Sequence, residues 1–139
     1  MHPARRLAIA ALFASAAAGA GDDATALAQA SGMELFGQFC ASCHGPSGRG
    51  DGPVAPTLKA TVPDLTAIGA RDGSFPAQRV RDMIDGRAMI PAHGTREMPV
   101  WGYEFEARVT SGLPARATAQ NMTDRVVEYL RSIQQPATR

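Results

Sequence analysis

The sequence predicts an all-α fold in one small domain. Apolar residues recur at helical spacing in residues 31–40, 75–85 and 122–135, and glycine and proline gather in the stretches between them. No stretch alternates apolar and polar residues as a half-buried strand does, and no internal repeat stands out. These observations favour a helical domain over residues 31–139.

The first predicted helix begins at Ser31, a residue type that caps helices well. Its apolar residues lie at positions that share one helical face: Leu35, Phe36, Phe39 and Cys40. Residues 45–56 are rich in glycine and proline and are predicted to be loop, followed by a short helical turn near residues 63–65.

A second helix is predicted over residues 75–85, with Pro76 in its first turn and Gly86 as its stop. Its inward-facing residues are expected to be Val80, Met83 and Ile84. Residues 87–101 contain three glycine or proline residues and are predicted to be a second loop.

The pattern over residues 105–121 is weak, and we expect a helical piece near 103–110 and a loop at 112–114. The last helix is predicted to start near Met122, capped by Asn121 or Thr123, and to end before Pro136. Its expected buried residues are Val126, Val127, Leu130 and Ile133.

Residues 1–30 have the pattern of a secretory signal peptide. A short basic start at residues 5–6 precedes an uncharged apolar run over 7–18, and small residues allow cleavage after Ala20 or Ala30. A membrane-spanning helix needs about 20 apolar residues, and this run ends too early because Asp22 follows it. The pattern predicts export to the periplasm, with no stable membrane insertion after processing.

The cysteines carry the clearest chemical signal. Cys40 and Cys43 are the two cysteines of the chain, and His44 follows them directly in the pattern C-x-x-C-H. Two thiols three residues apart on a helical turn can reach the two vinyl groups on one edge of a haem. The next residue is then carried under the iron. The pattern therefore predicts covalently attached haem c, with His44 as the proximal axial ligand.

Other interpretations of the cysteine pair are weaker. A redox dithiol needs a βαβ context, which the sequence does not predict. Zinc could take Cys40, Cys43, His44 and His93, but their spacing is not that of a zinc finger. A disulfide across two residues would be strained and would leave His44 without a role.

With this motif at the end of its first helix, the chain over residues 31–139 resembles a class I cytochrome c. That family crosses its first and last helices at a glycine, an aromatic one turn later, and an aromatic of the last helix. Gly32, Phe36 and Tyr129 stand at the matching positions. The resemblance implies a cytochrome c-like fold, with three to five helices wrapped around one covalently bound haem and the N- and C-terminal helices crossing.

The resemblance also implies residues around the haem. Pro56, twelve residues after His44, matches the proline whose carbonyl accepts a hydrogen bond from the proximal histidine. Such a bond fixes the imidazole tautomer and raises its basicity toward iron. Leu58 would pack on the haem. Trp101 would either donate its indole N–H to a haem propionate or pack at the haem edge.

Met98 resembles the family's distal methionine, because Pro99 follows it and it lies in a loop 54 residues after His44. A thioether favours Fe(II) and raises the reduction potential relative to a second histidine. His93 is the main alternative ligand and would give a low-potential haem. Met89 lacks a following proline, and three other methionines are expected in the core or as a cap: Met33, Met83 and Met122.

Two protein ligands leave no open position on the iron, so the resemblance implies a one-electron carrier rather than an enzyme. It would be a periplasmic monohaem cytochrome between a donor and an acceptor redox protein, in a respiratory or dehydrogenase chain. The alternatives are the haem subunit of a larger periplasmic oxidoreductase and, less expected, a haem that binds gas or peroxide. The sequence leaves open whether the chain is a monomer or a subunit.

The charge pattern bears on the partners. The net charge is +1, without a basic stripe, so no nucleic-acid partner is expected. Lys59 is the single lysine, which excludes a docking ring of lysines.

Overall fold

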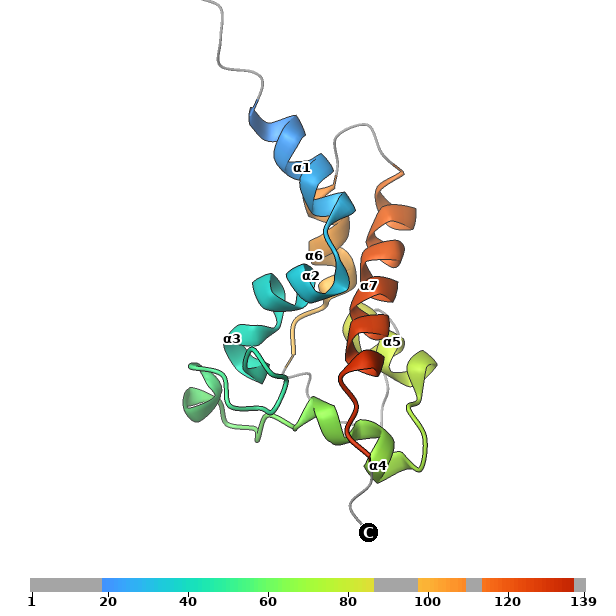
Figure 1. Cartoon of the computed structure of the whole chain (residues 1–139). Helices are drawn as coiled ribbons and strands as arrows, with labels where there is room; N and C mark the ends of the chain where they lie inside the picture. Colours follow the sequence, from blue (N-terminus) through green and yellow to red (C-terminus); the bar gives the residue numbers. More distant parts are fainter. Residues whose placement is uncertain (1–18, 87–97, 110–113, 137–139) are drawn as a thin grey trace, which may run out of the picture.

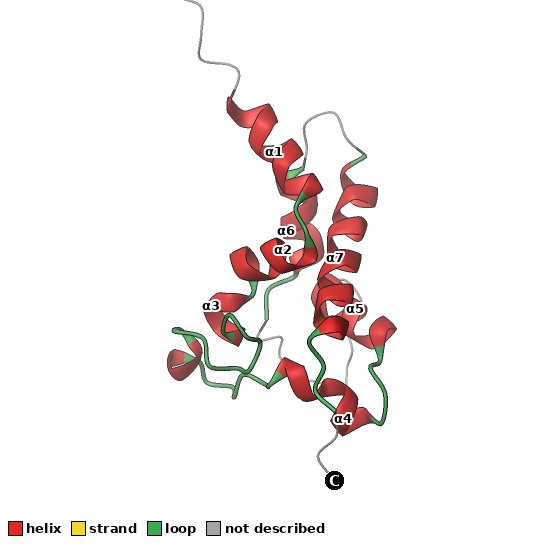
Figure 2. Cartoon of the chain, viewed as in Figure 1, coloured by secondary structure: helices red, strands yellow, loops and turns green. Residues whose placement is uncertain are grey.

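The computed structural model describes residues 19–86, 98–109 and 114–136, and side chains from residue 22 onward. Every element of regular structure in these ranges is a helix, which confirms the all-α prediction (Figure 2). The α-helices are α1 (Gly19–Gln29), α2 (Gly32–Phe39), α3 (Ala41–His44), α4 (Ile68–Asp72), α5 (Ala77–Asp85), α6 (Trp101–Arg108) and α7 (Ala115–Ser132). Two short 3-10 helices, η1 (Ala55–Thr57) and η2 (Leu65–Ala67), lie between α3 and α4.

Helix α2 starts as its sequence predicts. Ser31 is the N-cap, and its hydroxyl accepts a hydrogen bond from the Glu34 backbone N–H at 3.2 Å. The Glu34 carboxylate in turn accepts from the Ser31 backbone N–H at 2.7 Å. This reciprocal capping box satisfies two backbone donors that would otherwise lack partners. It fixes where α2 begins and therefore where its apolar face points.

Helices α2 and α7 cross at a close contact (Figure 1). A Cβ atom on Gly32 would lie 2.7 Å from the Arg125 backbone carbon and 2.9 Å from the Tyr129 Cβ. One turn along α2, the ring of Phe36 packs on that of Tyr129 with centroids 5.2 Å apart. The predicted crossing through Gly32, Phe36 and Tyr129 is confirmed.

Helix α7 is the centre of the hydrophobic core, because α1, α2, α5 and α6 all pack against it. The buried apolar side chains of the described residues form one cluster apart from Ala24: Leu35, Phe36, Phe39, Ile84, Phe105, Val109, Ala119, Met122, Val126, Val127 and Leu130. Within the described ranges, no helix is both long enough and apolar enough to cross a membrane.

The start of α7 differs from the prediction. The helix begins at Ala115, seven residues before Met122, and Thr123 is buried inside it rather than capping it. The Thr123 hydroxyl donates to the Ala119 carbonyl at 3.1 Å, which satisfies the hydroxyl without breaking the helix. The alanines at the start of α7 favour helix. The apolar pattern over these residues is weak, so it did not predict this part of the helix.

Helix α1 was not predicted as part of the domain. It packs on α7, with Ala24 buried, and the Arg125 guanidinium of α7 donates to the Ala28 carbonyl at 2.8 Å. Helix α5 begins at Ala77, two residues later than predicted, with Pro76 as its N-cap, and it ends at Asp85 as predicted. Gly86 follows as the C-cap, and its left-handed φ of 69° suits glycine. Helix α6 begins two residues before the helical piece expected from residue 103.

The segment after α7 is tied to η2 and α4. The Gln134 side chain accepts from the Gly69 N–H at 2.8 Å and donates to the Leu65 carbonyl at 2.7 Å. The Gln135 N–H donates to the Thr66 carbonyl at 2.8 Å. These bonds hold the middle of the chain against the end of α7.

Replacing Gly32 with alanine should destabilise the haem-loaded protein by about 1–3 kcal/mol, because the new methyl group overpacks the α2–α7 crossing. The matched control is Gly37→Ala in the same helix. A Cβ there meets no atom within 4 Å, so this change should stabilise by roughly 0.5–1 kcal/mol. Denaturant unfolding measures both, and equal effects would contradict the close crossing.

Candidate haem site

A single helical turn carries the C-x-x-C-H motif. Cys40 ends α2 and also begins α3, and the His44 N–H donates to the Cys40 carbonyl at 2.9 Å. Both cysteines are free thiols and half-buried. The turn therefore holds the two thiols and the imidazole in one compact unit.

The surroundings of Cys40 disfavour a charged sulfur. Burial against the core, and the nearby Cys43, raise the pKa of the Cys40 thiol to about 12. A thiolate is thus penalised here at neutral pH. A thioether carries no charge, so it would sit in the same place without this penalty.

His44 is also kept neutral by its surroundings. Burial lowers its pKa, and the Pro63 backbone carbonyl near the ring opposes this shift in part. Its Nδ1 atom is buried and has no hydrogen-bond partner among the described residues. Neutral imidazole is the form that binds metals. The two free thiols and this neutral imidazole fit a covalently held haem.

A glycine-rich loop that includes Gly50 and Gly52 packs against the turn that carries the motif. The Gly50 N–H donates to the His44 carbonyl at 2.8 Å, and the Gly52 N–H donates to the Cys43 carbonyl at 3.2 Å. A Cβ on Gly52 would lie only 2.5 Å from that Cys43 oxygen. Glycine is required there because the loop backbone lies directly against the α3 turn.

Pro63 is the site residue that sequence reasoning missed. A Cβ on Gly50 would lie 3.2 Å from the Pro63 carbonyl oxygen, so this loop brings Pro63 next to the turn that bears His44. The Leu65 N–H donates to the Gly48 carbonyl at 2.7 Å and fixes the same approach. Asp64 then caps η2, accepting from the Thr66 N–H at 2.8 Å. Gly48 and Gly50 indicate in the sequence that another backbone comes close, but they do not indicate that it is the backbone at Pro63.

Pro56 lies exposed in η1, and the backbone that affects the pKa of His44 is that of Pro63. The proposed hydrogen bond from His44 to Pro56 stays a prediction. Leu58 follows η1 with 43% of its surface exposed. An apolar side chain so exposed is available to pack on a cofactor.

An aromatic cluster brings the Met98 segment to the cysteines. The Trp101 ring lies 5.6 Å from that of Phe39, the residue before Cys40, and both rings pack on Phe105. Met98 is half-buried against the same core as Cys40. Phe39 and Trp101, which neighbour the two motifs, are thus in contact although they are far apart in sequence.

The other methionines and His93, which were the alternatives to Met98, differ in burial or lie outside the described residues. His93 and Met89 lie outside the described residues. Met122 is fully buried, as predicted, and Met83 is half-buried. The prediction that Met33 belongs to the core is wrong, since 63% of its surface is exposed.

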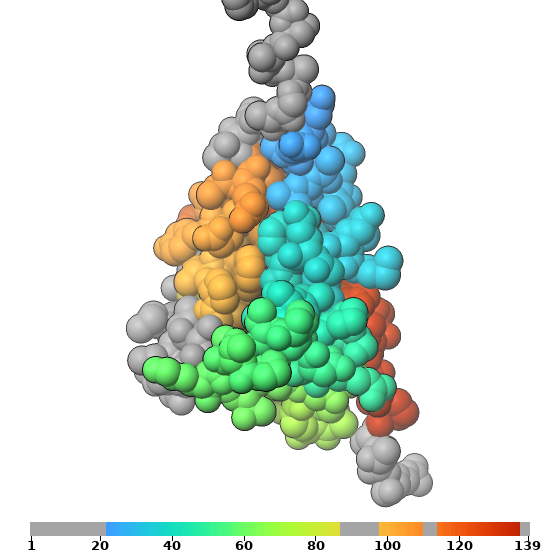
Figure 3. Space-filling model, turned by 90° about the vertical axis from the view of Figure 1, so that its left-hand side faces the viewer, coloured from blue at the N-terminus to red at the C-terminus, as the bar shows by residue number. Residues whose placement is uncertain are grey.

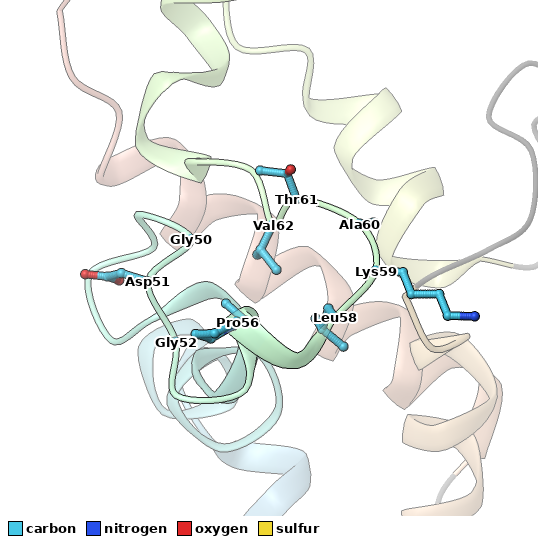
Figure 4. A pocket seen from close by; sticks show the side chains of 10 residues that line it. Gly50, Asp51, Gly52, Pro56, Leu58, Lys59, Ala60, Thr61 and Val62 are labelled. Atoms are coloured by element: carbon cyan, nitrogen blue, oxygen red, sulfur yellow. The ribbon is translucent and has the colours of Figure 1, made fainter.

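A cavity of about 480 Å³ lies beside the loop that supports the motif (Figure 4). Pro56 and Leu58 line it together with Lys59, whereas neither cysteine, nor His44, nor Met98 does so. Figure 3 shows the segment that contains it, in green, on the surface next to α2 and below α6. The cavity therefore borders the site and is not its centre.

The helical fold and the thiol–imidazole turn define a class of protein that attaches haem covalently. Residues 29–134 match the cytochrome c family model. The chain belongs to the cytochrome c family, and its cofactor is haem c. Comparisons with curated proteins and with solved structures returned no match.

Replacing Cys40 and Cys43 together with alanine should leave any haem removable by acid–acetone extraction, because no thioether bond remains. The wild-type protein should keep its haem through the same extraction. Haem staining of a denaturing gel gives the same comparison. Retained haem in the double variant would contradict the assignment of these thiols.

Proposed function

We propose that this protein is a monohaem one-electron carrier of the periplasm, with His44 and Met98 as the axial ligands. Haem c supplies a one-electron Fe(III)/Fe(II) couple when bound. The observation that carries the proposal is the contact between Phe39 and Trp101, which brings the C-x-x-C-H turn and the Met98 segment together.

Different residues attach the haem and coordinate its iron. Cys40 and Cys43 provide the covalent attachment, and His44 and Met98 fill both axial positions. Side chains at both positions leave no place for a substrate, which suits electron transfer and not catalysis. The rings of Phe39, Trp101 and Phe105 pack on one another and would shield the haem from water on the side of the core.

The rim of the site offers apolar groups to the cofactor. Leu58 and Pro56 lie at the cavity beside the motif, and Leu58 is the large exposed apolar side chain there. We infer that Leu58 packs on the haem and Trp101 at its edge. The partners are donor and acceptor redox proteins, and the near-neutral net charge gives no strong electrostatic steering toward either.

For the exported protein, we infer cleavage after Ala20 and not after Ala30. Cleavage after Ala30 would remove α1, whose Ala24 is buried and whose Ala28 carbonyl accepts from Arg125. Cleavage after Ala20 keeps these contacts in the mature protein.

The mature haem-loaded protein isolated from a periplasmic extract should begin at Gly21. Intact-mass measurement with N-terminal sequencing reads the first residue directly. A mature chain that begins at Ser31 would contradict the inference, and a chain that keeps residue 1 would contradict export with cleavage.

Replacing Met98 with alanine should abolish the weak near-infrared band from thioether to Fe(III) and lower the reduction potential, because the soft thioether that favours Fe(II) is lost. Optical spectra and a redox titration of the purified protein test this. His93→Ala is the matched control and should change neither. If the two variants behave the other way round, His93 is the ligand.

A further inference from the structure

We propose that the contact between Asp85 at the end of α5 and Gly102 in the first turn of α6 positions Met98 and thereby stabilises its bond to the iron. The inference rests on the proposed role of Met98. It assigns a positioning role to two residues that lie outside the attachment motif and the ligand set.

The two helices meet here without room for a side chain on α6. Gly102 is buried, and a Cβ on it would lie 2.7 Å from the Asp85 backbone oxygen and 2.9 Å from its Cγ. Distances below 3.0 Å force a movement, and a backbone oxygen cannot rotate away as a flexible side chain can. Any larger residue at position 102 must therefore separate the start of α6 from the end of α5.

The end of α5 is itself held in place. Ile84 is buried in the core, and α5 packs on α7. The Gly86 N–H donates to the Asp82 carbonyl at 2.9 Å, which closes the helix directly after Asp85. The carboxylate of Asp85 also lies at the N-terminus of α6, where negative charge is favourable. Asp85 thus offers a fixed surface to α6.

The start of α6 is connected to Met98 by a short, hydrogen-bonded stretch. The Trp101 N–H donates to the Pro99 carbonyl at 3.1 Å, and the Tyr103 N–H donates to the Val100 carbonyl at 3.1 Å. The Trp101 ring packs against both Phe39 and Phe105. Because these contacts leave little freedom between Met98 and Gly102, a shift of the first turn of α6 is transmitted to the thioether.

The test is Gly102→Ala in the full haem-loaded protein. We expect covalent haem to be retained, the thioether–Fe(III) band to weaken, and carbon monoxide to bind the reduced protein roughly tenfold faster. Gly37→Ala is the matched control, because a Cβ on that helical glycine meets nothing within 4 Å. It should leave the band and the carbon monoxide rate as in wild type.

A second control separates positioning from general loss of stability. Val127→Ala removes buried volume from α7 and should lower the unfolding midpoint while leaving the band unchanged. A band and carbon monoxide rate in Gly102→Ala equal to wild type would overturn the proposal. So would an equal change of both in Val127→Ala.

If Gly102→Ala cannot be obtained with haem attached, Asp85→Ala replaces it as the test variant, because this substitution adds no atoms to the contact between α5 and α6. It should weaken the band and speed carbon monoxide binding in the same direction, and wild-type behaviour would overturn the proposal. Met98→Ala separates the assignment of Met98 as ligand from the positioning role of Asp85 and Gly102. A band that survives Met98→Ala refutes the ligand assignment, whereas a band lost there but unchanged in Gly102→Ala refutes the positioning role alone.

Discussion

The close approach of α2 and α7 at Gly32 determines how the rest of the molecule is arranged. Cys40 alone separates α2 from α3, so the position of α2 on α7 decides where both thiols and His44 lie. Helices α5 and α6 pack on the same α7. One long helix is therefore the common reference for the attachment motif and for the segment that bears Met98.

The immediate surroundings of the motif favour uncharged groups. The same physical cause, burial, raises the pKa of Cys40 and lowers the pKa of His44. Both shifts favour the neutral forms, a protonated thiol and a neutral imidazole. In the proposed attachment, Cys40 would become an uncharged thioether and His44 a neutral nitrogen ligand, so the polypeptide environment suits that chemistry.

Much of the fold followed from local patterns in the sequence. The Ser31 cap and the Gly86 stop are each encoded by residues next to the helix they bound. The crossing at Gly32 joins residues far apart in the chain, and it was implied by the family resemblance. The beginning of α7 was missed because its apolar spacing is weak and its helical tendency comes from alanine. Helix α1 was missed because an apolar, alanine-rich start reads as an export signal, and only its packing on α7 makes it part of the domain.

The site residues that are adjacent in sequence could be predicted. Those brought to the site by loops could not. Cys40, Cys43 and His44 form one pattern, whereas Pro63 reaches the histidine through glycines that no spacing rule connects to it. Likewise, Asp85 and Gly102 are separated by 17 positions, and only the helix packing brings them into contact. Contacts of this kind depend on tertiary structure and produce no periodic pattern in the sequence.

The composition of the loop beside the motif has a practical consequence. Lys59 is the one lysine of the chain, and it lies exposed at the rim of the cavity next to Leu58. Amine-directed reagents consequently find a single side-chain target, on the same face as the cysteine turn's supporting loop. A dye or an electrode tether coupled there would be anchored at one known point of the surface, with no engineered residue.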